Sequence, residues 1–139
     1  MKNITSLNAT AVMVIEELYP AGFTLEQFST DAAISQGDDT FAETRMGVDG
    51  QMVVGVVDNI KTVTITLEPS SPSMEYLITL AKAIRTNKKH YPATLIINIP
   101  ALGSTRTYSN GALKTGKILP DINKTLKPVP FTFDFEKVS

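Results

Sequence analysis

Alternation of apolar and polar residues with a period of two dominates this chain and predicts a mainly β fold. In residues 61–68, Val63, Ile65 and Leu67 alternate with threonines, which indicates a strand with one buried face and one solvated face. Phenylalanines alternate with polar residues in the same way over residues 130–136. Both segments are expected to contribute one face to a common core.

Two further segments are apolar on both faces. Residues 9–15 have this pattern, and residues 52–57 share it, interrupted by Gly55, where we expect a β-bulge. A strand that is apolar on both sides lies inside a sandwich or against a partner. Another strand is predicted over residues 94–99, before Pro100.

A single helix is predicted over about residues 72–87. Ser71 can cap it, and Pro72 suits its first position. The face expected to contact the sheet carries Met74, Leu77, Ile78, Ala81 and Ile84. A flank of further apolar residues widens the sector beyond what a lone helix on a small sheet needs: Tyr76, Leu80 and Ala83. We expect a loop or a neighbouring subunit to cover this flank.

Residues 36–50 carry few large apolar side chains and predict a long loop. Such a length is typical of a functional loop, although a plain surface loop fits as well. The dipeptides Asp49-Gly50 and Asn110-Gly111 each predict a tight hairpin turn, because these residues accept positive φ angles.

Composition describes one soluble domain over residues 1–139, with 42% apolar residues. Cysteine is absent and His90 is the one histidine, which excludes disulfides, thiolate clusters and a multi-histidine metal site within one chain. No apolar run approaches the length of a membrane helix, and the N-terminus lacks the features of a secretory signal. We therefore expect a cytoplasmic site of synthesis and no catalytic metal.

The candidate chemistry is weak. Residues 111–117 match the spacing of a phosphate-binding loop, but Ile118 stands where the motif needs Ser or Thr. Asp38, Asp39 and Glu43 lack the order and the turn glycine of a calcium loop. His90 has no catalytic partner at a recognised spacing. We expect no enzyme, no catalytic residue, no cofactor and no bound metal.

Charge is divided along the chain although the net charge is only -1. Residues 1–59 hold nine acidic and two basic residues, whereas residues 60–139 hold eleven basic and five acidic ones. Three interpretations stay open: a surface for nucleic acid or another protein, opposite charges that merely solubilise one fold, and head-to-tail self-association.

The order of these elements resembles the tail tube proteins of contractile-tailed bacteriophages, specifically a family of small phage structural proteins assigned to that tube. The resemblance covers roughly residues 8–138, and its most specific stretches are residues 45–51 (Arg-Met-Gly-Val-Asp-Gly-Gln) and 61–80. It implies two antiparallel sheets folded into a barrel-like sandwich with one flanking helix, a fold shared with the type VI secretion tube protein. It also implies hexameric rings stacked into a hollow tube.

Site residues follow partly from this resemblance. In that family the long loop reaches the neighbouring ring, which assigns ring stacking to Asp38, Asp39, Phe41, Glu43, Arg45, Met46 and Asp49. An uncharged polar face suited to a lumen wall is expected at Thr62, Thr64 and Thr66, although an outer solvent face explains these threonines equally well.

The first hypothesis is therefore a phage tail tube subunit in the virion tail, assembled in the host cytoplasm, through which DNA is ejected without being bound specifically. Its partners are expected to be other copies of itself and the sheath, baseplate and tape-measure proteins. The second hypothesis is a tail completion or baseplate protein of the same fold, acting as a small-oligomer binding module. A small enzyme with an unrecognised pocket ranks last.

Overall fold

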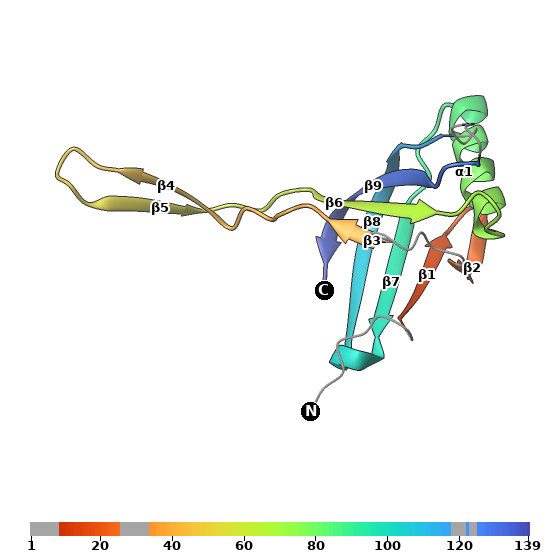
Figure 1. Cartoon of the computed structure of the whole chain (residues 1–139). Helices are drawn as coiled ribbons and strands as arrows, with labels where there is room; N and C mark the ends of the chain where they lie inside the picture. The colour runs from red at the N-terminus through yellow and green to blue at the C-terminus, as the bar shows by residue number, and fades with distance from the viewer. Residues whose placement is uncertain (1–8, 26–33, 118–121, 123–124) are drawn as a thin grey trace.

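A computed structural model of the chain describes residues 9–25, 34–117, 122 and 125–139 (Figure 1). Within these residues the chain forms nine strands, one α-helix and one short 3-10 helix, so the mainly β prediction is confirmed. The elements in chain order are β1 (Thr10–Ile15), β2 (Tyr19–Thr24), β3 (Ile34–Gln36), β4 (Ala42–Met46), β5 (Met52–Val56), β6 (Lys61–Leu67), α1 (Ser73–Asn87), β7 (Ala93–Ile99), η1 (Pro100–Leu102), β8 (Ser104–Thr115) and β9 (Val129–Val138).

Seven of the strands form one antiparallel sheet in the order β2-β1-β7-β8-β9-β6-β3. Strands β4 and β5 pair only with each other, as a hairpin. The predicted barrel-like sandwich of two antiparallel sheets is therefore confirmed only in part. The second sheet is just the β4–β5 hairpin, and the described strands of the large sheet, which ends at β2 and β3, do not close a barrel. Figure 1 shows β6 running across the direction of β7, so the sheet is strongly twisted.

The core lies between one face of this sheet and α1. Alternate residues of the strands point into it, and the three phenylalanines of β9 are at most 1% exposed: Phe131, Phe133 and Phe135. Leu77 and Leu80 of α1 are fully buried against them in the same cluster. In β1, Ala11, Met13 and Ile15 face this core, whereas Val12 and Val14 are half-buried on the opposite face.

Helix α1 begins and ends within one residue of its predicted bounds. The Ser71 hydroxyl accepts a hydrogen bond from the backbone N–H of Ser73 at 3.2 Å, as a capping residue does. At the other end Lys88 adopts a left-handed conformation, with φ of 49°, which glycine usually provides at this position. The 15-residue helix is too short to cross a membrane, and no helix among the described residues is long and apolar enough to do so.

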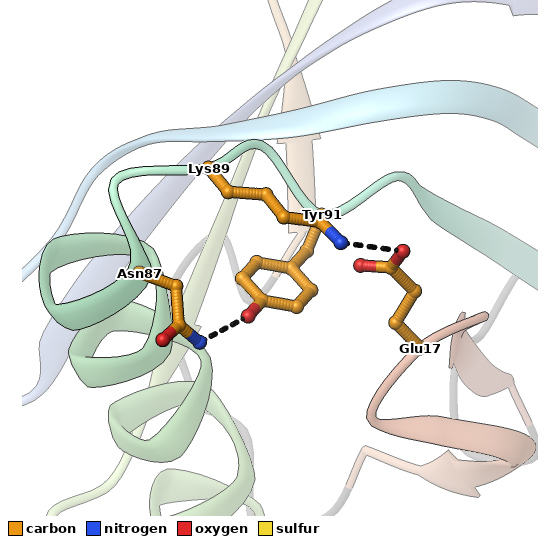
Figure 2. A network of polar contacts seen from close by, with 4 residues as sticks. All are labelled: Glu17, Asn87, Lys89 and Tyr91. Carbon is orange, nitrogen blue, oxygen red and sulfur yellow. Dashed lines mark hydrogen bonds and ion pairs between the residues drawn. The ribbon is translucent and has the colours of Figure 1, made fainter.

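A small polar network fastens the connection after α1 to the turn between β1 and β2 (Figure 2). Lys89 Nζ donates to Glu17 Oε1 at 2.8 Å, and the Lys89 ammonium lies 5.5 Å from the centre of the Tyr91 ring. Asn87 Nδ2 donates to the Tyr91 hydroxyl at 2.6 Å. The basic residue after the helix therefore has a structural role, and its pairing with Glu17 raises the pKa of Lys89.

The hairpin turn predicted at Asn110-Gly111 is wrong. Both residues lie inside the long strand β8, where the register against β7 shifts and Asn110 takes a φ of 55°. An extra residue with positive φ is the signature of a β-bulge. Gly111 is required there by packing, because a Cβ would lie 2.3 Å from the ring of Phe135.

Candidate functional site

The most distinctive feature of the molecule is a hairpin that extends away from the body, which we call the arm and define as residues 38–60. Figure 1 shows β4 and β5 reaching out beyond the edge of the sheet formed by β3 and β6. Its tip is the five-residue turn 47–51, in which Gly50 has a φ of 81° and donates to the carbonyl of Gly47 at 3.0 Å. The predicted turn at Asp49-Gly50 is thus present, within a longer connection.

The two sides of the arm differ in chemistry. Strands β4 and β5 pair in continuous register without a shift, so the bulge expected at Gly55 is absent. Every second cross-strand pair points to the same side. One side, which we call the apolar face of the arm, carries Ala42, Thr44, Met46, Met52, Val54 and Val56. The other side holds both charged residues of β4, Glu43 and Arg45, opposite Gly55 and Val53.

This apolar face is exposed in the single chain. Met46 and Met52 are 69% and 63% exposed, and Val56 is 92% exposed. Strand β5 was expected to lie inside a sandwich or against a partner, and burial within its own chain is wrong because β4 and β5 pair only with each other. An isolated two-stranded hairpin is marginal at best in water, and monomers rarely expose apolar patches this continuous. The arm therefore has the properties of a contact surface for a partner.

The predicted long loop over residues 36–50 is in fact one side of this arm. It contains the end of β3, a connection and the whole of β4. Of the predicted stacking residues, Met46 and Asp49 lie at or beside the tip, whereas Phe41, Glu43 and Arg45 lie along the shaft. Asp38 and Asp39 belong to the base, in the connection between β3 and β4.

The base of the arm is held by two polar contacts. Lys61, 8% exposed, pairs with Asp58, and this contact and charge lower the pKa of the Asp58 carboxyl below 3.8. The hydroxyl of Tyr108 donates to Gln36 Oε1. Burial, and then the negative charge of Asp39, raise the pKa of Tyr108 above its ordinary value of 10.0. These contacts fix where the arm leaves the body.

The predicted lumen residues lie on β6, on the face of the sheet opposite α1, and are half-buried. Thr62 donates to Asp134 Oδ1 at 2.7 Å, and Thr64 lies 3.4 Å from the hydroxyl of Thr132. Asp134 also lies 3.7 Å from the ammonium of Lys114. The threonine face exists as predicted, but it is not free of charge.

The predicted interface flank of α1 is wrong for Leu80 and stays a prediction for Tyr76 and Ala83. Leu80 is fully buried in the core, and Ala83 is partly buried against it. Tyr76 is 36% exposed, and its ring stacks on Phe23 at 4.4 Å between centroids and meets Tyr19 edge-on at 4.9 Å. The wide apolar sector of the helix is covered by its own chain, since the strongly twisted sheet and the β2 aromatics reach round it.

Sequence reasoning missed the residues that make the arm apolar. Val54, Val56 and Ile60 are 52%, 92% and 67% exposed, and none was assigned to a contact surface. The signal in the sequence was that residues 52–57 are apolar on both faces, and such residues can be buried against a partner as well as in the chain's own core. Among the described residues no group of His, Cys, Asp or Glu side chains is placed to hold a metal ion.

Comparison with known proteins relates this architecture to phage-like tails. A family model described as tail fiber protein gp32 matches residues 2–139. No curated protein matches the chain.

Several solved structures share the fold at low sequence identity. The sheath/tube terminator of the extracellular contractile injection system PVC, in its extended state, has a TM-score of 0.66 at 12% identity and covers 100% of this chain and 96% of its own. A chain of the anti-feeding prophage baseplate scores 0.63 at 11% identity, covering 100% and 95%. The cap that terminates the anti-feeding prophage tube scores 0.60 at 12% identity, covering 100% and 92%. The resemblance noted in the sequence is confirmed at the level of a phage-tail-like fold.

Proposed function

The chain belongs to the tail fiber protein gp32 family, and from that premise we propose that it is a structural subunit of a bacteriophage tail tube. Copies assemble into hexameric rings, the rings stack head to tail, and the resulting hollow tube is the conduit for DNA ejection. The sheath, baseplate and tape-measure proteins are its neighbours in the virion tail, after assembly in the host cytoplasm.

The observation that carries this proposal is the exposed apolar face of the arm. A subunit that offers a projecting arm to a different surface of its neighbour makes a heterologous contact, which generates rings when the rotation closes and filaments when it does not. Val54 and Val56 would gain burial in such a contact, because they are 52% and 92% exposed in the single chain. A self-assembling subunit accounts for their exposure.

The face of the sheet opposite α1 supplies the wall of the tube in this proposal. It presents hydroxyls from Thr62, Thr64 and Thr66, and its charges on β8 and β9 include the opposed pair Lys114 and Asp134. A conduit has to let DNA slide, and an excess of Lys and Arg would add salt-dependent grip on phosphates. We expect no binding of duplex DNA at micromolar concentration in physiological salt.

The proposal assigns no chemistry to the protein. It acts by binding copies of itself, without an enzymatic activity or a cofactor. The exposed arm and the polar sheet face support this reading, because both offer area for contact with other molecules and neither brings a nucleophile, base and oxyanion donor together.

A tail completion or baseplate protein is the second candidate. It is favoured by the nature of the structures with the same fold, which include a sheath/tube terminator, a tube-terminating cap and a baseplate chain. A protein of this kind forms one ring or a small oligomer that closes the end of a tube, so the arm engages a tube subunit and not another copy.

Electron microscopy of the purified protein, with sedimentation velocity over a concentration series, tests the proposal. Stacked rings or hollow tubes are expected for a tube subunit, whereas a single defined oligomer at every concentration indicates the completion protein. Solid fibres without a central channel would instead fit the fibre named in the family description. The matched control replaces residues 38–61 by Asn-Gly, which joins β3 to β6 as an ordinary two-residue hairpin, since Gly37 already donates to the carbonyl of Thr62 at 3.2 Å. It removes Lys61 together with its partner Asp58. That variant should fold and stay monomeric.

A further inference from the structure

A groove of about 130 Å³ lies between the C-terminal half of α1 and the end of β8. Its floor is apolar and comes from Ala81, Ile84, Leu113 and Phe131. Its rim is basic, with Arg85 of the helix and Lys117, just after β8, among its lining residues. A groove with this lining suits an apolar knob that carries a negative charge beside it.

The tip of the arm has that chemistry. Val48 is completely exposed at the turn, and Met46 and Met52 beside it are 69% and 63% exposed. Asp49 follows Val48 directly and places a carboxylate next to this apolar knob. The described arm as a whole holds five carboxylates and one guanidinium, so its sign is opposite to that of the rim.

The arm cannot place its tip in the groove of its own chain. Figure 1 shows the arm leaving the body on the side away from α1, with the tip at the far end of β4 and β5. Any contact between tip and groove therefore joins two molecules.

We propose that the tip of the arm of one copy docks into this α1–β8 groove of a second copy. The inference rests on the self-assembly in the proposed function and adds to it the surface that receives the arm. Val48 fills the apolar floor beside Ala81, and Asp49 lies against the Arg85 side of the rim. The contact is heterologous, because the tip and the groove are different parts of the chain.

Disulfide trapping tests this docking directly, because the natural chain contains no cysteine. The double variant Val48→Cys, Ala81→Cys carries one thiol at the tip and one in the groove. A disulfide needs Cα atoms about 4.4–6.8 Å apart, so mild oxidation of the assembled protein reports contact between them. The matched control is Val48→Cys, Thr105→Cys, whose second thiol lies at an exposed position of β8 on the opposite face of the sheet.

The expected result is a ladder of covalent oligomers on a non-reducing gel for the 48/81 variant and none for the control. Assembled 48/81 protein without a ladder would overturn the groove as the receptor while leaving the proposed function in place. Wild-type protein that never assembles would overturn both. A charge exchange adds a second readout: Asp49→Lys should raise the concentration needed for assembly roughly two- to fivefold, and Arg85→Asp in the same chain should restore it. Failure of this restoration would count against the pairing of Asp49 with Arg85.

Discussion

Replacing Val54 by aspartate tests whether the apolar face of the arm is a contact surface, and Val53 supplies a matched control. The two valines are adjacent in β5 and are 52% and 49% exposed. Consecutive strand residues point to opposite sides, so Val54 belongs to the apolar face while Val53 lies opposite Arg45 on the charged side. Residue type, exposure and position along the arm are thus nearly the same, and only the face differs.

The magnitude follows from burial. Burying a whole valine side chain contributes at least about 1.5 kcal/mol, so the exposed half of Val54 is worth roughly 0.8 kcal/mol on docking. A carboxylate at the same place has to lose its water without a partner, which costs several kcal/mol. The lost burial and the desolvation cost together weaken each contact by about 3 kcal/mol, which raises the dissociation constant roughly a hundredfold.

The stability of the single chain should change little in either variant, because surface substitutions usually stay within about 0.5 kcal/mol. An aspartate at position 53 also gains the cross-strand charge of Arg45, worth about 0.2–1 kcal/mol. Sedimentation velocity measures assembly, and circular dichroism during heating measures unfolding. The reasoning is refuted if Val54→Asp assembles at wild-type concentrations, or if Val53→Asp loses assembly to the same degree.

Four further predictions concern the body of the fold. Leu80→Glu should prevent folding, because Leu80 is fully buried and an unpaired buried charge costs several kcal/mol; a native circular dichroism spectrum would contradict this. Lys88→Gly should raise the free energy of unfolding, measured in urea, by about 0.5–1 kcal/mol, because glycine adopts the left-handed conformation after α1 without strain. Gly111→Ala should lower the same free energy by about 1–3 kcal/mol, because its Cβ clashes with the Phe135 ring. The pKa of Tyr108 is raised in the folded protein, so on raising the pH its hydroxyl ionises in the unfolded chain before it does so in the folded one. The free energy of unfolding should therefore fall as the pH rises above 10.0. Comparing the phenolate absorbance of wild type and Tyr108→Phe during a pH titration measures the ionisation of this hydroxyl.

The parts of the fold that could be predicted from the sequence are those with a regular spacing of apolar residues. The alternation at Val63, Ile65 and Leu67 and that of the β9 phenylalanines correspond to strands in which these six residues are all buried. The helix was predicted from its spacing and its Ser71 cap, and its bounds agree within one residue. In each case a local pattern determines the element and its inward face.

The order of strands in the sheet and the exposure of the arm could not be predicted, because both depend on contacts between residues far apart in the sequence. An apolar run such as residues 52–57 has the same pattern whether it enters its own core or that of a partner, so its exposure could not be read from the sequence. Leu80 was assigned to a flank covered by a loop or a neighbouring subunit, because the apolar sector is wider than a lone helix on a small sheet needs. The twisted sheet buries this wider sector within the chain itself. Asn110-Gly111 suits a bulge as well as a turn, because both need a positive φ angle.

The central position of β9 has a consequence for the synthesis of the protein. This strand lies between β8 and β6, and its pairing with β6 joins Lys61 to Phe135. The sheet therefore cannot be completed until residue 138 has left the ribosome. At about 5–20 residues per second, roughly 3–12 s separate the end of β6 from the start of β9. During that interval the arm has already been made while the body that presents it is unfinished. Neighbouring nascent chains on one messenger RNA consequently hold arms but no completed body until β9 has been translated.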